Sequence, residues 1–180
     1  MSQFDAKERI LQIIKQKAVL RGKFILSSGK ESDYYIDIKK VSFDGEFLEL
    51  VSDIIADLIF SNFKTCDVAG VELGGVPLVS ATVLKIKQKG FDSKGVIIRK
   101  NPKEYGTQKW IEGPDNISKV VLIEDVITTG ATTLSAIDKL RQNGIEAEGV
   151  ICVVNRGGLR NIADKNIKAM SIFELQDIIS

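Results

Sequence analysis

The stretch VVLIEDVITTGATT, residues 120–133, decides the fold class of this 180-residue chain. It begins with four apolar residues in succession, which is typical of a strand that is covered on both faces in a parallel sheet. Two acids, Glu124 and Asp125, then lead into a loop rich in threonine and glycine, and a helical pattern begins at about Thr132. A buried strand that runs through such a loop into a helix indicates an α/β fold.

The loop of this stretch predicts a phosphate site, because ligands of open α/β sheets bind beyond the carboxyl ends of the strands. Threonine hydroxyls and the backbone N–H groups at a helix start can bind a phosphate, and Gly130 permits the close approach that this needs. Two carboxylates would repel a bare anion, so Glu124 and Asp125 indicate sugar hydroxyls or a cationic centre beside the phosphate. A ribose 5-phosphate meets both requirements. The alternative is a threonine-capped helix whose preceding acids are simply exposed at the sheet edge.

Apolar runs and helical stretches alternate along the rest of the chain, which predicts one α/β domain over residues 1–180 with a parallel sheet flanked by helices. Residues 1–40 form a helical and extended annex to it. The expected strands are 67–71, 96–99, 120–124 and 150–155, and the expected helices are 5–19, 46–61, 76–88 and 132–143.

One polar stretch, NPKEYGTQKWIEGPD at residues 101–115, does not fit this alternation. Loops of this length without secondary structure are uncommon unless they act as lids or binding loops. We therefore expect a flexible lid loop at 101–115, with a solvated excursion or a small hairpin as the alternative.

Composition excludes several classes of protein. The 25 basic and 24 acidic residues nearly cancel, so no uniform field favours nucleic acid or a membrane surface. The chain has no histidine, which excludes Ser-His-Asp catalysis and histidine-based zinc sites. Its charged N-terminus lacks the apolar core of a signal peptide, and no apolar run is long enough to span a membrane. These features predict a cytoplasmic protein in which Cys66 and Cys152 are buried free thiols rather than a disulfide.

Several segments together resemble the type I phosphoribosyltransferases, and among these the orotate enzymes of the archaeal type. Residues 120–133 are similar to the family's motif for phosphoribosyl pyrophosphate (PRPP). The other similar segments, in the expected order, are FILSSGKESDYYIDIKK (24–40), VAGVELGGVPL (68–78), IIRKNPKEYGT (97–107) and VVNRGG (153–158). The resemblance implies the type I phosphoribosyltransferase fold, in which a mostly parallel sheet carries a small N-terminal hood and a lid.

The resemblance also implies the site residues. Lys103, Glu124 and Asp125 would be catalytic, and residues 70–75 resemble the pyrophosphate loop. Thr128 and Arg156 would recognise orotate, since a guanidinium can bind both oxygens of a planar carboxylate. The alternative for Arg156 is a surface or phosphate-contacting arginine. The implied PRPP-binding residues are Arg99, Lys100, Lys103, Tyr105, Glu124, Asp125, Val126, Ile127, Thr128, Thr129, Gly130, Ala131 and Thr132.

The implied reaction transfers ribose 5-phosphate from PRPP to orotate and gives orotidine 5′-monophosphate and pyrophosphate, in pyrimidine biosynthesis. The implied cofactor is Mg²⁺, bound through PRPP with Glu124 and Asp125 engaging it through water, and the implied assembly is a homodimer with shared active sites. Three positions depart from the family pattern. Tyr105 stands where many bacterial members have histidine, and Ser27 and Gly74 stand where some have lysine, so Lys103 and Mg²⁺ would carry more of the charge compensation.

Two other functions remain open from the sequence. The PRPP motif does not distinguish orotate from adenine, hypoxanthine or uracil as the acceptor base. A non-catalytic regulator that senses PRPP or a nucleotide is the second alternative. Against the regulator, both acids and Lys103 are present, and the chain has neither a DNA-binding module nor a basic excess. We expect neither a nucleic acid nor a membrane as a partner.

Overall fold

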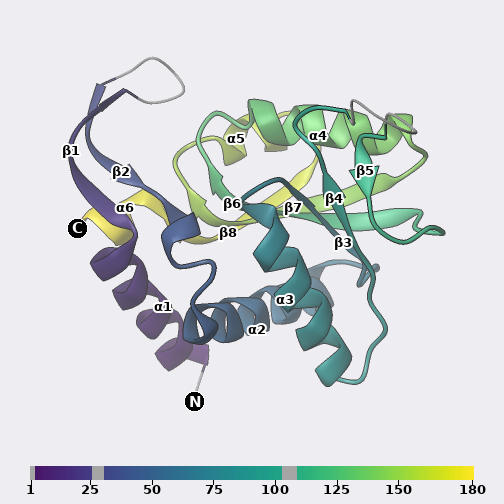
Figure 1. Ribbon diagram of the computed structural model, residues 1–180, viewed down its shortest axis with the longest axis horizontal. Coiled ribbons are helices and arrows are strands. Elements are labelled where there is room, and N and C mark those ends of the chain that lie inside the picture. The colour runs from purple at the N-terminus through teal and green to yellow at the C-terminus, as the bar shows by residue number, and fades with distance from the viewer. Residues whose placement is uncertain (1–2, 26–30, 103–108) are drawn as a thin grey trace.

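The computed structural model describes residues 3–25, 31–102 and 109–180 (Figure 1). The first half contains α1 (Gln3–Lys17), β1 (Val19–Ile25), β2 (Glu31–Ile36), the 3-10 helix η1 (Ile38–Lys40), α2 (Gly45–Asn62), β3 (Val68–Val71), α3 (Gly75–Gln88) and β4 (Gly95–Ile98). The second half contains β5 (Ile111–Glu112), β6 (Lys119–Ile127), α4 (Ala131–Gln142), β7 (Glu146–Asn155), α5 (Leu159–Ala163), β8 (Lys168–Glu174) and α6 (Leu175–Ile179). None of the helices described is long and apolar enough to cross a membrane.

A six-stranded sheet in the order β5-β4-β3-β6-β7-β8 forms the centre of the molecule. All neighbouring strands run parallel except β4 and β5, which are antiparallel. The helices α1, α2 and α3 cover one face, and α4 and α5 cover the other (Figure 1). This arrangement confirms the α/β class and the mostly parallel sheet. It also explains the continuous apolar run in β6, since Val120–Ile123 contribute to the cores on both faces.

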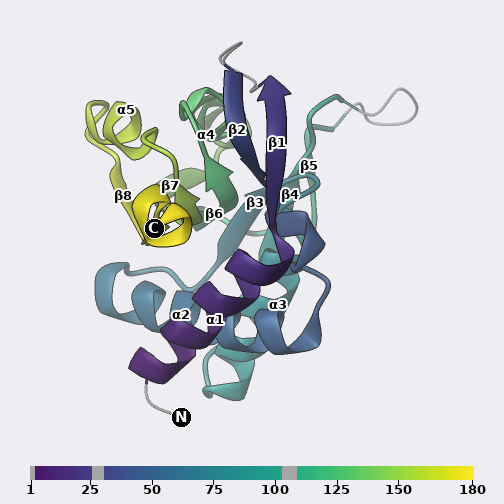
Figure 2. The same ribbon diagram turned by 90° about the vertical axis from the view of Figure 1, so that its left-hand side faces the viewer.

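The N-terminal hood is an antiparallel hairpin of β1 and β2, which forms a sheet separate from the six-stranded one. Figure 2 shows its two strands rising above α1. Its base is fixed where the chain returns to the core, because Ile36, Ile38 and Val41 are all buried there. The tip, residues 26–30, lies outside the described residues. The expected annex is thereby confirmed as a short helix followed by a hairpin.

Several expected boundaries were wrong. The strand expected to end at residue 124 continues to Ile127, because Val126 and Ile127 still pair with β7. The sheet also contains β5, which lies within the lid expected at 101–115 and pairs with β4, so that part of the expected lid is a strand. No element was expected after residue 155, where α5, β8 and α6 lie.

The two cysteines are free, as the sequence predicted. Cys152 is buried in β7, but Cys66 is only half-buried, so the expectation of two buried thiols was half wrong. Burial raises the pKa of both thiols, so both remain protonated near neutral pH.

Candidate active site

A cavity of about 300 Å³ lies at the carboxyl ends of β3, β4 and β6, where the parallel sheet was expected to bind its ligand. Most of the residues that the sequence analysis assigned to the PRPP site meet there. The lining residues are Lys39, Val71, Glu72, Leu73, Gly74, Lys100, Glu124, Asp125, Val126, Ile127, Thr128, Thr129, Gly130, Thr132 and Thr133.

The loop between β6 and α4 is built to leave backbone N–H groups free at the helix start. Gly130 has a left-handed φ of 79°, and a Cβ there would come within 3.1 Å of the carbonyl oxygen of Gly158. The Asn161 side-chain amide donates a 3.0 Å hydrogen bond to the carbonyl oxygen of Thr129 and holds the loop from outside. Gly130 itself provides no side-chain cap for α4. The Ala131 N–H lies 3.4 Å from the Thr129 hydroxyl, and the remaining N–H groups of the first turn are available to an anion.

The two acids at the end of β6 differ in their surroundings. Glu124 is 6% exposed and accepts a 3.2 Å hydrogen bond from the Thr133 hydroxyl. Burial and the charge of Asp125 raise the pKa of Glu124 to about 8, against the opposing effects of Thr133 and Lys100. Burial also raises the pKa of Asp125, which is opposed by a 2.8 Å hydrogen bond from the Val126 N–H and by the charge of Lys39. Without ligand, Glu124 is therefore largely protonated near neutral pH.

This acid pair fits a metal that is held mainly by substrate. No group of three or more acidic or thiol side chains within the described residues could hold a metal ion by itself. Glu124 and Asp125 nevertheless face the same cavity, and carboxylate oxygens suit Mg²⁺, which retains several waters and usually takes further ligands from substrate phosphates. The two acids therefore fit a Mg²⁺ that is held mainly by substrate oxygens.

A second cavity, also of about 300 Å³, adjoins the first one beneath the hood. Its lining residues are Ile25, Tyr35, Ile36, Lys39, Asp125, Val126, Thr128 and Arg156. Four of these, Lys39, Asp125, Val126 and Thr128, line both cavities. The guanidinium carbon of Arg156 lies 5.5 Å from the ring centroid of Tyr34, so an aromatic side chain of the hood faces the arginine. Thr128 and Arg156 thus lie together, as the resemblance implied.

Asn155 holds the turn that carries Arg156, and the sequence analysis missed it. Its side-chain oxygen accepts hydrogen bonds from the N–H groups of Gly157 and Leu159, at 2.9 and 3.2 Å. Its amide nitrogen donates a 2.8 Å bond to Glu174 at the end of β8. An asparagine at the end of a buried strand is a common turn former, which is the signal that could have revealed it.

The two basic residues directly after β4, Arg99 and Lys100, differ in whether they line the first cavity. Lys100 lines the first cavity, and its backbone N–H donates a 2.6 Å hydrogen bond to Glu72. Arg99 is not among the residues that line this cavity. Its guanidinium lies 3.6 Å from Glu112 and donates a hydrogen bond to the carbonyl oxygen of Asn101. Lys103 and Tyr105, two further expected site residues, lie outside the described residues.

Ala131 does not line the first cavity but lies beside it. It lines a neighbouring hollow together with Lys100, Thr132 and Lys139. Its backbone N–H faces the Thr129 hydroxyl at 3.4 Å, within the loop that precedes α4.

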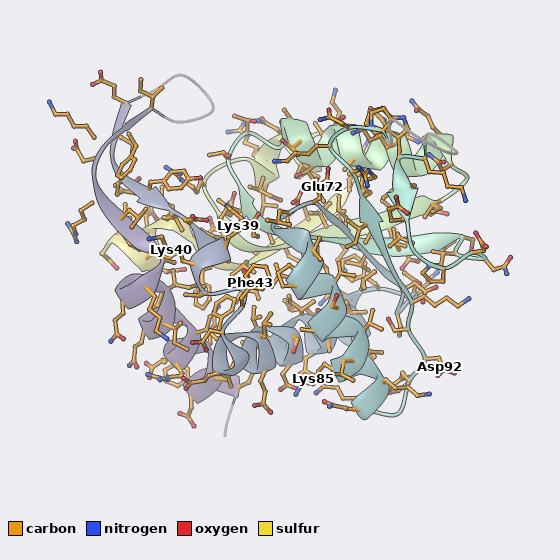
Figure 3. The ribbon with its side chains drawn as sticks, in the orientation of Figure 1. Lys39, Lys40, Phe43, Glu72, Lys85 and Asp92 are labelled. Atoms are coloured by element: carbon orange, nitrogen blue, oxygen red, sulfur yellow. The ribbon has the colours of Figure 1, made fainter. Side chains whose placement is uncertain are left out.

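The sequence analysis gave no role to the cavity residue Lys39, and it included Glu72 and Thr133 only as members of the longer stretches 70–75 and 120–133. In Figure 3, Lys39 comes from the connection between the hood and α2, and Glu72 comes from the loop after β3. Thr133 lies nine residues after Glu124, and only the turn into α4 brings its hydroxyl back to that carboxyl.

Comparison with known proteins agrees with this geometry. The family model described as "Phosphoribosyl transferase domain" matches residues 43–179. The orotate phosphoribosyltransferase of Methanocaldococcus jannaschii is 41% identical over an alignment 180 residues long, and this alignment covers 98% of each chain. That of Thermococcus gammatolerans is 38% identical and covers 97% of this chain and 93% of its own. A crystal structure of Mycobacterium tuberculosis orotate phosphoribosyltransferase superposes with a TM-score of 0.83 at 26% identity and covers 97% of this chain and 99% of its own. With both cavities at the carboxyl ends of its strands and full-length likeness to these proteins, the chain belongs to the type I phosphoribosyltransferase family, in its orotate phosphoribosyltransferase group.

Proposed function

We propose that this protein transfers ribose 5-phosphate from PRPP to orotate, producing orotidine 5′-monophosphate and pyrophosphate for pyrimidine biosynthesis. One observation carries the proposal: two adjoining cavities share Asp125 and Thr128, and one holds a phosphate loop while the other holds Arg156. A reaction that joins a phosphorylated sugar to a carboxylated base requires two such sites in contact. The full-length likeness to orotate phosphoribosyltransferases supports the same substrates.

The first cavity would hold the ribose 5-phosphate. Its phosphate would accept hydrogen bonds from the N–H groups at the start of α4 and from the hydroxyls of Thr128, Thr129 and Thr132. The ribose hydroxyls would donate to Glu124 and Asp125 at the end of β6. Because charge-assisted hydrogen bonds of this kind are strong, they would fix the position of the sugar.

The second cavity would hold the base. The guanidinium of Arg156 suits the orotate carboxylate, and the Thr128 hydroxyl lies where it can contact the same ligand. The Tyr35 side chain provides an aromatic wall from the hood. The ring nitrogen of the base would then point toward the boundary of the cavities, where Asp125 lies.

Breaking the bond between ribose and pyrophosphate leaves positive charge on the sugar and additional negative charge on the leaving group. The carboxylates of Glu124 and Asp125 would stabilise the cationic sugar, and cationic side chains would stabilise pyrophosphate. Mg²⁺, when bound with PRPP, neutralises part of the phosphate charge. Holding the two substrates in line can lower the barrier by roughly 7–11 kcal/mol, so the protein needs no nucleophile of its own.

The proposal extends to Lys103 and to the assembly. The resemblance assigns Lys103 to the departing pyrophosphate, and an ammonium close to this group would lower the barrier further. The family resemblance supports a cytoplasmic homodimer in which Arg99, whose guanidinium lies 3.6 Å from Glu112 in this chain, serves the neighbouring active site. Tyr105 would contact PRPP only as a hydrogen-bond donor, because a phenol hydroxyl is a poor general base near neutrality.

The test uses purified protein with Mg²⁺ and PRPP and follows pyrophosphate release with orotate, uracil, adenine or hypoxanthine. Release that depends on orotate supports the proposal. Release with another base alone would favour a different phosphoribosyltransferase, and no release with any base would favour a regulator. Asp125→Asn is the matched control, since it keeps the shape of the site but removes one carboxylate, and it should abolish most of the release.

A further inference from the structure

Lys39 lies where the two cavities meet, and the proposed reaction has so far given it no role. It lines both the phosphate-loop cavity and the Arg156 cavity. Among the described residues that line the first cavity, the cations are Lys39 and Lys100, against three acids: Glu72, Glu124 and Asp125. A ligand with several negative charges would need cations in this site, so the position of Lys39 has consequences for binding.

The backbone around Lys39 is firmly held. The neighbouring Ile38 is fully buried, and its carbonyl oxygen accepts hydrogen bonds from the N–H and hydroxyl groups of Ser42, both at 2.9 Å. The Lys39 ammonium lies 2.7 Å from a carboxylate oxygen of Asp37. The next residue, Lys40, is exposed and lines neither cavity. In Figure 3, Lys39 is placed between the hood and the central sheet. The fold thus separates two adjacent lysines into a site residue and a surface residue.

The loop after β3 provides no cation of its own beside Asp125, because the residue next to this acid is Gly74. Gly74 approaches Asp125 so closely that a Cβ on this glycine would collide with the Asp125 carboxylate. A lysine at this position would therefore require the loop or the acid to move. Lys39 reaches the same region from the hood, and its charge acts on the same carboxylate.

Lys39 is also protonated in this setting. Burial lowers its pKa, but the hydrogen bond to Asp37 and the charges of Asp125 and Asp37 raise it by more, so the net effect is a raised pKa. Its side chain is 40% exposed, which leaves the ammonium accessible to a ligand.

We propose that Lys39 is a substrate-contacting catalytic residue that binds the pyrophosphate group of PRPP from the hood side, where the pyrophosphate loop carries Gly74. This inference rests on the proposed function. As the bond between C1 of ribose and the pyrophosphate oxygen breaks, the electron pair goes to that oxygen. A new bond forms between C1 and the ring nitrogen of orotate, and the proton of that nitrogen passes to the departing pyrophosphate. Lys39 stabilises the negative charge on the leaving group and remains an ammonium throughout, so it transfers no proton itself.

The test compares Lys39→Met with Lys40→Met, since the two changes remove the same charge from adjacent positions. Calorimetric titration measures the binding of pyrophosphate with Mg²⁺ and, separately, of orotidine 5′-monophosphate, which lacks the pyrophosphate group. We expect Lys39→Met to weaken pyrophosphate binding by on the order of 10–100-fold and orotidine 5′-monophosphate binding by less than about threefold. Lys40→Met should change neither by more than about twofold, and kcat for orotate should fall only in the Lys39 variant.

Equal weakening of both ligands, or no weakening of either, would overturn the inference, because the first result indicates a structural role and the second no role. Lys39→Arg keeps the charge, so it should retain most of the affinity for pyrophosphate. If Lys39→Met does not fold, the same pyrophosphate titration is carried out with Lys39→Arg. The binding of pyrophosphate does not depend on turnover. A wild-type protein that binds pyrophosphate through Lys39 but releases none from PRPP with orotate would therefore refute the proposed reaction separately.

Discussion

At the scale of single residues, Glu124 is a carboxyl group whose surroundings differ strongly from water. It is 6% exposed, next to Asp125, with the Thr133 hydroxyl as its hydrogen-bond donor. Burial and the charge of Asp125 raise its pKa to about 8 from 4.5. The folded protein therefore holds a proton on Glu124 over a pH range in which the unfolded chain has released it. Ligands that bring positive charge, such as Mg²⁺ or a cationic sugar, would favour the ionised form.

This raised pKa makes the stability of the ligand-free protein depend on pH. The contribution of Glu124 to the free energy of unfolding is fully present below about pH 4.5 and is lost as the pH rises through about 8. The reason is that the folded state binds more protons than the unfolded chain in this interval. Between pH 5 and 8 the free energy of unfolding of the wild type should therefore fall by an amount on the order of 1–3 kcal/mol because of Glu124. This part of the fall should be absent in Glu124→Gln. Urea denaturation without Mg²⁺ or PRPP measures it. Glu8→Gln, on the exposed side of α1, is the control, and a Glu124→Gln profile parallel to wild type would refute the assignment.

The sequence could predict the identity of the site acids but not their partners. Glu124, Asp125 and Thr128 lie in one continuous stretch, so their proximity follows from the local pattern of strand, loop and helix. Lys39 lies far from this stretch in sequence and reaches it only because the buried Ile38 fixes the base of the hood. Such a contact depends on tertiary packing, which local patterns do not encode.

At the scale of elements, α4 connects the phosphate loop to the end of β4. Lys139, in its last turn, donates hydrogen bonds to the carbonyl oxygens of Arg99 and Lys100, at 3.1 and 3.4 Å. Its ammonium also lies 3.9 Å from the ring centroid of Trp110, just before β5. One lysine therefore holds both the end of β4 and the approach to β5 against the helix that begins at the phosphate loop.

Replacing Lys139 should loosen this connection. Lys139→Met keeps the apolar length of the side chain but removes its donors and charge, and we expect it to lower the free energy of unfolding by about 1–2 kcal/mol. Because Lys100 lines the first cavity, where we propose that PRPP binds, KM for PRPP should also rise severalfold. Arg141→Met is the matched control, since Arg141 is exposed and pairs only with Asp138 on the same helix among the interactions that the structure describes. Equal effects in the two variants would contradict the role of Lys139.

The elements that the sequence did not predict are those with weak local patterns. β8 contains Lys168, Ser171 and Glu174 beside its buried Ile172 and Phe173, so it lacks the continuous apolar run of β6 and β7. It is an edge strand, and one side of it needs no neighbour. β5 is only two residues long, and its pairing with β4 lies within a polar stretch that read as a loop. In both cases the sheet, rather than local propensity, determines the strand.

At the scale of the whole molecule, the hood and the sheet together form the second cavity, and the proposed dimer would complete the active site. Arg99 points to Glu112 rather than into the cavity of its own chain. If Arg99 serves the partner's site, two inactive variants should complement each other when their subunits mix. This behaviour would distinguish a shared site from one that a single chain completes.

The complementation test mixes Arg99→Ala with Arg156→Ala in equal amounts after exchange of subunits. A hybrid dimer would have one intact site and one site with both defects, so about a quarter of all sites should recover. Orotate-dependent pyrophosphate release measures this recovery against each variant alone. Activity that stays at the sum of the two separate variants would place Arg99 in the site of its own chain.

The measurement that tests the central claim most directly is the preference of the enzyme for orotate over uracil, which lacks the carboxylate. The ratio of kcat/KM for the two bases in wild type should be on the order of 10³ or more, because in the proposed site the carboxylate would bind Arg156 in the second cavity. Arg156→Ala should reduce kcat/KM for orotate by on the order of 10²–10³ and leave that for uracil and KM for PRPP nearly unchanged. A wild-type enzyme that uses uracil as well as orotate, or an Arg156→Ala variant that loses both bases equally, would contradict this account of the site.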